Sequence, residues 1–169
     1  MPDERDDRPR DGSEAARIAA LIASLPRGDD ATVVVGPGDD AAVLRPRDGR
    51  DLVVTTDTFV EGRHFRRDLL TPSEIGGRLA AANLSDLAAM AAMPRWAVLS
   101  LVVPPAWSAG DALLLERACA RALQADGASV VGGNLASGDG AFSATVTLLG
   151  DVERGRGSAP APGPATCSR

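Results

Sequence analysis

The segment 71–93 is the feature that most constrains the fold of this chain, because both of its ends are marked. Thr71 and Glu74 have the spacing of a capping box, and Pro72 occupies the first helical position between them. Pro94 ends the segment, since proline cannot continue a helix. We therefore predict a long helix here, which needs an apolar surface to pack against.

Strands are predicted on both sides of this helix. A second long helix is expected from Ser108 to about Gly127, and a shorter one from Ser13 to Leu25 with an apolar stripe. The predicted strands are 31–35, 41–44, 52–56, 96–103, 129–131 and 141–152. Strands that alternate with long helices indicate the α/β (α+β) class, with a mixed sheet of about four main strands and helices packed on one face.

Acidic residues lie against or within three of the apolar segments. The three sites are 38–40, before an apolar strand, 55–57, at the expected end of strand 52–56, and 83–86, inside the helix of 71–93. Unpaired buried carboxylates cost several kcal/mol, on the order of the stability of a whole domain. A hard divalent cation such as Mg²⁺, carrying a phosphorylated ligand, would explain them together.

Each acidic site also has a simpler explanation. Asp86 falls on the apolar stripe of its helix, where an arginine could pair it instead of a metal. Asp57 could simply hydrogen-bond its own turn, although Thr55 and Thr56 add hydroxyl oxygens to it. Asp40 and its neighbour Asp39 could belong to an ordinary turn, although adjacent carboxylates repel each other and favour a cation.

Two further features are candidates for ligand contact. Gly132, Gly133 and Asn134 follow a predicted strand, where they form either a plain turn or a close backbone approach to a ligand. His64 is the only histidine, and it is either incidental or a substrate contact or proton carrier.

Composition excludes several classes of protein. The 18 cationic residues are all arginine, so there is no P-loop lysine and no Schiff-base lysine. The net charge of −5 argues against a nucleic-acid surface, and no apolar segment approaches the roughly 18 residues of a membrane helix. The cysteines, Cys119 and Cys167, match no metal spacing, and the acidic N-terminus lacks the apolar core of a signal peptide. We therefore expect a cytoplasmic protein that binds neither nucleic acid nor membrane.

The acidic and glycine motifs together resemble the thiamine-monophosphate kinase family, within the superfamily of aminoimidazole ribonucleotide (AIR) synthase, selenophosphate synthetase and a hydrogenase maturation protein. The resemblance covers roughly 13–156. It rests on Gly-Asp-Asp-Ala-Ala-Val at 38–43, Thr-Thr-Asp-Thr at 55–58, Glu-Gly-Arg-His-Phe at 61–65, Asn-Leu-Ser-Asp-Leu-Ala-Ala-Met at 83–90 and Val-Gly-Gly-Asn at 131–134.

The resemblance implies ATP-dependent phosphorylation of thiamine monophosphate to thiamine diphosphate, with Mg²⁺ as the metal and ATP as co-substrate. It also implies a homodimer in which two sheets pair across a two-fold axis through an exposed hydrophobic strand face. His64 corresponds to the substrate contact, and Gly133, Asn134 and Arg156 to nucleotide contacts. The implied metal ligands are Asp40, Thr55, Thr56, Asp57, Asp86 and Asn134. No catalytic base is assigned, since a phosphate acceptor is already ionised.

The chain departs from the family in three places. Asn134 stands where many members have aspartate, and Glu116 stands where an aromatic adenine contact is expected. We divide the chain into a disordered N-terminus, 1–12, a metal- and nucleotide-binding domain, 13–152, and a flexible or aberrant tail, 153–169. The family's second domain is expected to be absent, through truncation or a frameshift near Gly155, so we expect weak turnover at most.

Two other functions remain open from the sequence. One is a different ATP-dependent enzyme of the superfamily, although a selenophosphate synthetase would need a reactive cysteine near the N-terminus, and none is present there. The other is a non-catalytic dimerisation module that binds Mg-nucleotide.

Overall fold

The computed structural model describes residues 14–25 and 30–156. The expected disorder of 1–12, the N-cap Ser13, Cys167 and the tail beyond 156 lie outside the described residues. The elements in chain order are α1 Glu14–Ser24, β1 Val33–Val35, β2 Val43–Leu44, β3 Arg50–Val60, α2 Pro72–Ala89, β4 Met93–Val103, α3 Ala109–Ala125, β5 Ser129–Ser137 and β6 Ser143–Glu153.

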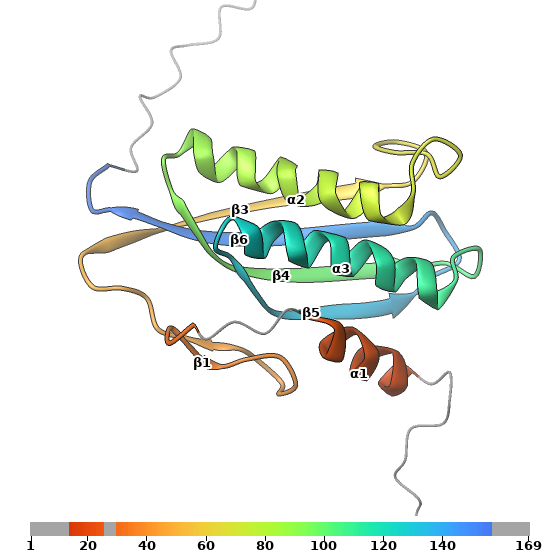
Figure 1. The fold of residues 1–169 in the computed structure, drawn as a ribbon, viewed down its shortest axis with the longest axis horizontal. Coiled ribbons are helices and arrows are strands. Elements are labelled where there is room, and N and C mark those ends of the chain that lie inside the picture. Colours follow the sequence, from red (N-terminus) through yellow and green to blue (C-terminus); the bar gives the residue numbers. More distant parts are fainter. Residues whose placement is uncertain (1–13, 26–29, 157–169) are drawn as a thin grey trace, which may run out of the picture.

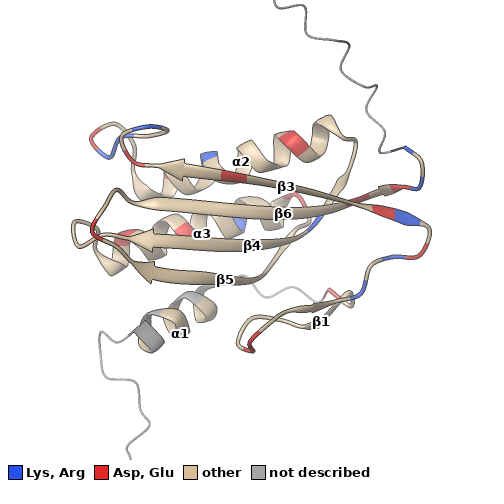
Figure 2. Cartoon of the chain, turned by 180° about the vertical axis from the view of Figure 1, so that it is seen from behind, with Lys and Arg blue, Asp and Glu red and all other residues tan. Residues whose placement is uncertain are grey.

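Four long strands form one mixed sheet in the order β3-β6-β4-β5. β6 is antiparallel to both of its neighbours, whereas β4 and β5 are parallel and are joined through α3. α2 and α3 cover one face of this sheet (Figure 1), and no described helix covers the other face (Figure 2). The predicted four-stranded mixed sheet with helices on one face is confirmed.

The two long helices begin where the sequence predicts. Thr71 accepts from the Glu74 N–H and the Glu74 carboxylate accepts from the Thr71 N–H, which completes the capping box of α2. Ser108 caps α3 by accepting from the Asp111 N–H at 3.0 Å. α2 and α3 cross so closely at Gly76 that an added Cβ would lie 2.1 Å from the backbone oxygen of Leu115. No helix in the described part of the chain is long and apolar enough to cross a membrane.

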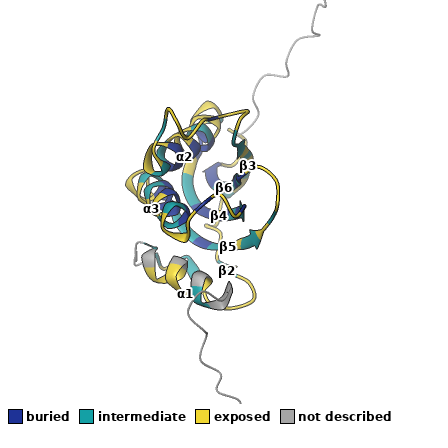
Figure 3. Ribbon diagram, turned by 90° about the vertical axis from the view of Figure 1, so that its right-hand side faces the viewer, coloured by how far each residue is buried: buried dark blue, intermediate teal, exposed yellow. Residues whose placement is uncertain are grey.

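The core lies between these helices and the sheet (Figure 3). Successive residues of a strand point to opposite faces, so alternate residues of β6 point toward the helices. Ala144, Val146 and Leu148 are fully buried in this way, and Phe142 is buried just before the strand, which begins at Ser143 rather than at 141. The apolar helix-facing side explains why the sheet forms in this register, because a one-residue shift would expose these side chains.

Several predicted boundaries are wrong. α2 ends at Ala89 rather than near Met93, and Pro94 does not end it but lies within β4, which begins at Met93 rather than at 96. The strand predicted as 52–56 is β3, which continues to Val60, so Asp57 lies within the strand rather than at its end. β3 is also an edge strand, and Val54 is 60% exposed rather than buried. The strand predicted as 129–131 is β5, which continues to Ser137 because it goes on pairing with β4 through the two glycines after a register shift between Ala97 and Val98.

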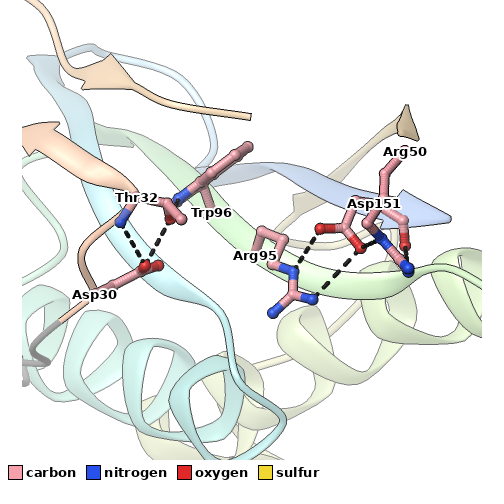
Figure 4. Close-up of polar contacts among 6 residues, drawn as sticks. All are labelled: Asp30, Thr32, Arg50, Arg95, Trp96 and Asp151. Carbon is pink, nitrogen blue, oxygen red and sulfur yellow. Dashed lines mark hydrogen bonds and ion pairs between the residues drawn. The ribbon is translucent and has the colours of Figure 1, made fainter. Parts of the chain in front are cut away.

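The short hairpin of β1 and β2 forms a separate two-stranded sheet that is anchored to the main sheet through Trp96. The indole Nε1–H of Trp96 donates to Thr32 Oγ1 at 3.1 Å, and Thr32 donates in turn to Asp30 from its hydroxyl at 2.6 Å and its N–H at 2.9 Å (Figure 4). Trp96 is 2% exposed, so its N–H would be costly to leave unpaired. This relay holds the strand that leads into Asp39 and Asp40.

A buried carboxylate, Asp151, joins the ends of three strands. It accepts from Arg50 Nε, and Arg95 Nε donates to it at 2.8 Å (Figure 4). Burial alone would raise the pKa of the Asp151 carboxyl, but the hydrogen bonds and charges of Arg95 and Arg50 outweigh it and hold the pKa below its usual value.

Because the pKa of Asp151 is lower when folded than when unfolded, its contribution to stability is present above the unfolded pKa of about 3.9. That contribution is lost as the pH falls through the folded pKa. We expect Asp151→Asn to lower the free energy of unfolding at pH 7 by about 1–3 kcal/mol and to flatten its acid dependence. Urea titrations between pH 2 and 7 measure this. Asp48→Asn, at an exposed turn, should have the same free energy of unfolding as the wild type at each pH. If Asp151→Asn loses as much stability at low pH as the wild type does, Asp151 is not the source of the acid dependence.

Candidate functional site

A side-chain hydrogen bond joins the second and third acidic motifs. Thr55, in β3, donates from Oγ1 to Asp86 Oδ2 at 2.6 Å, although the two residues are 31 positions apart. The contact forms because β3 and α2 run antiparallel and pack together at this edge of the sheet, which brings the later part of α2 beside the middle of β3. Both atoms are oxygens at the protein surface.

Asp57 shares this location, but Thr56 does not. Asp57 is two residues after Thr55, so its side chain leaves the same face of β3 as the Thr55 hydroxyl. Thr56 points to the opposite, helix-free face, where its hydroxyl lies 3.1 Å from Thr147 Oγ1 and donates to the Val146 carbonyl at 3.1 Å. We call Thr55, Asp57 and Asp86 the β3 group.

The expectation that these carboxylates are buried is wrong. Asp40 and Asp86 are exposed, and Asp57 is half-buried. Asp86 leaves the apolar stripe because the helix face that contacts α3 and the sheet is instead formed by Ile75, Leu79, Asn83 and Leu87. Asn83 is fully buried; its Nδ2 donates to the Leu79 carbonyl at 3.0 Å, and its Oδ1 has no protein partner among the described residues.

The first acidic motif lies at a cavity of about 590 Å³ on the other edge of the sheet. The acids of the β1–β2 loop, Asp39 and Asp40, face β5 across it, where Gly133 and Asn134 form part of the wall. An added Cβ at Gly133 would lie 2.1 Å from the backbone oxygen of Leu99, so glycine is needed there for the close pairing of β4 and β5. We call Asp40, Gly133 and Asn134 the β5 group.

Glu116 of α3 also lines this cavity and is 4% exposed. This is the residue that stands at the expected position of an aromatic adenine contact. A carboxylate there offers acceptor oxygens instead of a ring face. Arg156 does not line the cavity; it follows β6, where its Nε lies 3.4 Å from Glu153 Oε2.

The structure therefore places the predicted metal ligands in two groups. β3 and β5 are at opposite edges of the sheet, three strand spacings or about 14 Å apart. Within 14–25 and 30–156, no three carboxylate, imidazole or thiol groups gather closely enough to hold a metal ion. All donors in both groups are oxygens, and Mg²⁺ in proteins typically takes one or two carboxylates and completes its shell with water and phosphate. The donor chemistry of both groups fits Mg²⁺ bound together with phosphates.

His64 lies at the end of β3, beyond the β3 group. Its ring stacks on Phe59, with ring centroids 5.6 Å apart and an interplanar angle of 11°. Thr55, Asp57 and Phe59 follow one another on the same face of β3, with about 7 Å between successive members. The β3 group and His64 thus form one row along this strand.

No local sequence pattern predicts the cluster of polar and aromatic side chains that lies behind His64. Glu61 accepts from Trp107 Nε1 at 2.7 Å and from Arg67 Nε at 3.0 Å, and the Arg67 guanidinium lies 4.9 Å from the centre of the Trp107 ring. Phe65 and Phe142 complete the cluster, with Phe142 stacked on Trp107 at 3.8 Å. Glu61 and Trp107 are 46 positions apart, and Phe142 lies still farther along the chain from Phe65, so only the fold reveals these contacts.

Comparisons with known proteins show the family of this chain. The family model described as AIR synthase related protein, N-terminal domain, matches residues 38–152. A thiamine-monophosphate kinase of Bacillus subtilis (strain 168) is 33% identical over 125 residues, which are 74% of this chain and 38% of that protein.

Solved structures of the same family also match this chain. The crystal structure of thiamine-monophosphate kinase from Stenotrophomonas maltophilia K279a is 35% identical with a TM-score of 0.68, over 83% of this chain and 42% of that one. A structure of AaThiL complexed with AMPPCP and TMP is 30% identical with a TM-score of 0.59, over 64% of this chain and 35% of that one.

The match thus covers most of this chain but about two-fifths of its relatives. The matched residues contain both acidic groups, His64 and the four-stranded sheet that positions them. The chain belongs to the AIR synthase related protein family, whose N-terminal domain it contains.

Proposed function

We propose that this chain is the metal- and nucleotide-binding part of a thiamine-monophosphate kinase, which transfers a phosphoryl group from ATP to thiamine monophosphate and forms thiamine diphosphate. The observation that carries the proposal is the row of Asp86 with Thr55, Asp57 and His64 along β3. A relative with the same fold is complexed with AMPPCP and TMP, which supports both ligands.

The residues of the β3 group would hold Mg²⁺ against the phosphates of ATP, with Asp40 and Asn134 of the β5 group as further ligands. Bound Mg²⁺ neutralises phosphate charge and orients the donor and acceptor. The chain needs no general base for this chemistry, since the attacking phosphate oxygen is already ionised. Gly133 would allow the nucleotide to approach the β5 backbone, and Arg156 is the proposed phosphate contact.

In this proposal the protein acts in the cytoplasm. Cys119 is a buried free thiol, and burial and the nearby Glu116 charge raise its pKa to about 12, so it is inert as a nucleophile. A free structural thiol is the usual state in a reducing compartment.

Calorimetry with a non-hydrolysable ATP analogue and Mg²⁺, with and without thiamine monophosphate, tests the function. The kinase proposal expects both ligands to bind, with weak ADP release at most from this chain, which spans 38% of its Bacillus relative. Nucleotide binding without any binding of thiamine monophosphate would instead indicate a nucleotide-binding module. If neither ligand binds at millimolar concentration, the proposal is wrong.

The helix-free face of the sheet is the proposed dimer interface. Val54 and Val98 are 60% and 37% exposed on it, and the hydroxyl pair of Thr58 and Thr145, at 2.9 Å, lies beside that of Thr56 and Thr147. The face is thus a mixture of valine and threonine, whereas the family resemblance implies a hydrophobic strand face. Figure 2 shows few charged residues along β6, β4 and β5, with an acidic position within β3 and the other charges on loops, strand ends and helices.

A charge in the middle of this face should prevent pairing, because an unpaired charge in an interface is costly to desolvate. We expect Thr147→Arg to be monomeric in sedimentation experiments in which the wild type is a dimer. Ser85→Arg, on the exposed side of α2, is the matched control and should remain a dimer. A wild-type monomer at high concentration, or a dimeric Thr147→Arg, would refute this interface.

A further inference from the structure

The β1–β2 hairpin is attached to the main sheet by side chains and not by strand pairing. Its backbone bonds are internal, since β1 pairs with β2 and the Arg45 N–H donates to the Thr32 carbonyl at 2.7 Å. Among the described residues, the hydrogen bond that joins segment 30–45 to the rest of the chain is the one from Trp96 Nε1 to Thr32 Oγ1 (Figure 4). A two-stranded hairpin is marginally stable by itself, so its position depends on how it is attached.

Trp96 lies on the opposite side of the sheet from the two long helices. It pairs with Leu149, whereas the next residue, Ala97, pairs with Leu148, whose side chain points to the helices. The indole is nevertheless almost completely buried, although it is not part of the hydrophobic core between the helices and the sheet. Trp96 is also not among the residues that line the cavity at Asp40. Its burial therefore belongs to the junction of the hairpin with the sheet.

Asp30 supports this junction from the hairpin side. The Thr32 hydroxyl donates its hydrogen to Asp30, which leaves the oxygen free to accept from the indole. Partial burial alone would raise the pKa of the Asp30 carboxyl, but the Thr32 hydrogen bonds and the charge of Arg95 outweigh it and hold the pKa below its usual value. Arg95 in turn donates to Asp151 at 2.8 Å. Two neighbouring residues of β4 thus connect the base of the hairpin to the sheet.

The tip of the hairpin carries acids that have no other support. Asp39 and Asp40 are exposed, and the Asp40 N–H donates to Asp39 Oδ1 at 2.9 Å. No further side-chain hydrogen bond or ion pair joins either acid to another residue within 14–25 and 30–156. Both line the cavity whose opposite wall includes Asn134. The position of Asp40 relative to β5 is therefore set at the base of the hairpin.

We propose that Trp96, Thr32 and Asp30 are positioning residues for Asp40: they fix the hairpin on the sheet, and the hairpin holds Asp40 across the cavity from Asn134. The effect on metal and nucleotide binding rests on the proposed function, whereas the attachment of the hairpin does not. Ligand binding at Asp40 and attachment at Trp96 must then favour each other by the same factor, because the coupling between two sites is reciprocal.

Hydrogen exchange of the indole N–H groups measures the attachment directly. The chain has two tryptophans, so Trp107→Phe assigns both indole signals in an NMR spectrum. We expect Thr32→Val to speed exchange at Trp96 about tenfold, because a buried donor that loses its acceptor is costly. Asp30→Ala, which keeps the acceptor of the indole, should speed it by a smaller factor, and Thr32→Ser, which keeps the hydroxyl, should match the wild type.

The Trp107 indole is the internal control, since its N–H is held by Glu61 in another part of the fold. Its exchange rate should be the same in the wild type and in these three variants. An unchanged rate at Trp96 in both Thr32→Val and Asp30→Ala would overturn the attachment. An equal rise at both indoles would show that these residues stabilise the whole fold, and it would overturn the attachment as well.

A ligand tests the link to Asp40 through the reciprocal effect. With a saturating non-hydrolysable ATP analogue and Mg²⁺, exchange at Trp96 should slow severalfold in the wild type and should not slow in Asp40→Asn. In calorimetry, Thr32→Val should bind the Mg-nucleotide more weakly than the wild type, and Thr32→Ser should bind it equally well. Thr32→Val should cause no further loss in the Asp40→Asn background, because two changes that act through one group are not additive.

The outcomes separate the possible failures. Additive losses of Thr32→Val and Asp40→Asn, or equal slowing of Trp96 exchange in the wild type and Asp40→Asn, would overturn the positioning role. A wild type that binds no nucleotide in the presence of Mg²⁺ would overturn the proposed function together with the link to Asp40. The exchange rates without ligand would still decide the attachment of the hairpin.

Discussion

Gly76→Ala is expected to destabilise this fold by about 3 kcal/mol, at the upper end of the usual cost of overpacking a core. The added methyl group would lie 2.1 Å from the Leu115 carbonyl oxygen and 3.0 Å from the Cys119 nitrogen, which are both backbone atoms of α3. Neither atom can move aside without shifting the whole helix. α2 and α3 would have to separate over the core that they share with the sheet.

Gly77→Ala provides a matched control one residue later in the same helix. Nothing lies within 4 Å of an added Cβ at Gly77, so the substitution should stabilise α2 by about 0.5–1 kcal/mol through its helix propensity. Urea unfolding followed by circular dichroism gives both free energies. Equal stability of the two variants would contradict the close approach of α2 and α3.

Local sequence patterns predicted the order of the elements because the two long helices carry their own start signals, whereas the end of α2 was placed about four residues too late, at Pro94. The capping box at Thr71 and the cap at Ser108 depend on residues three positions apart, and both form as predicted. The alternation of Phe142, Ala144, Val146 and Leu148 likewise depends on one strand alone. The ends of β3 and β5 were missed because pairing with β6 and β4 carries the strands past Asp57 and past the segment 132–134, where aspartate, glycine and asparagine have low strand propensity.

The candidate site was predicted in part. The family resemblance predicts Thr55 and Asp86 as metal ligands, and the fold brings these two side chains into contact. Helical periodicity, however, placed Asp86 on the buried side of α2, because the apolar stripe of an alanine-rich helix is broad and its true centre is set by α3. Nothing local predicted that Asp40 lies at the opposite edge of the sheet, since strand order is a property of the whole topology.

The same limit applies to the side chains that support the site. Glu61 was noted only as part of a motif, yet it holds Trp107 from 46 positions away. Asp151 joins Arg50 and Arg95, and its partner Arg50 is 101 positions away. Such contacts need the tertiary structure, because no periodicity connects residues at these separations.

The carboxylates of the β3 group are expected to make nucleotide binding depend on magnesium. Asp57 and Asp86 would each either bind the metal ion through a carboxylate oxygen or orient another oxygen ligand. Replacing either residue by asparagine removes a negative charge with little change in the shape of the side chain. Loss of a residue that only orients a metal ligand typically lowers affinity about 10- to 100-fold, and loss of a ligating carboxylate should cost at least as much. Thr55→Val should have a smaller effect, since it removes the hydrogen bond to Asp86 but no charge.

Calorimetric titration with a non-hydrolysable ATP analogue, with and without Mg²⁺, tests this account most directly. The wild type should bind the nucleotide only when Mg²⁺ is present, and Asp57→Asn and Asp86→Asn should each lose at least about tenfold in affinity. Asp48→Asn, an exposed carboxylate of a distant turn, should bind like the wild type. Equal affinity with and without Mg²⁺, or wild-type affinity in Asp57→Asn and Asp86→Asn, would contradict a magnesium site at β3.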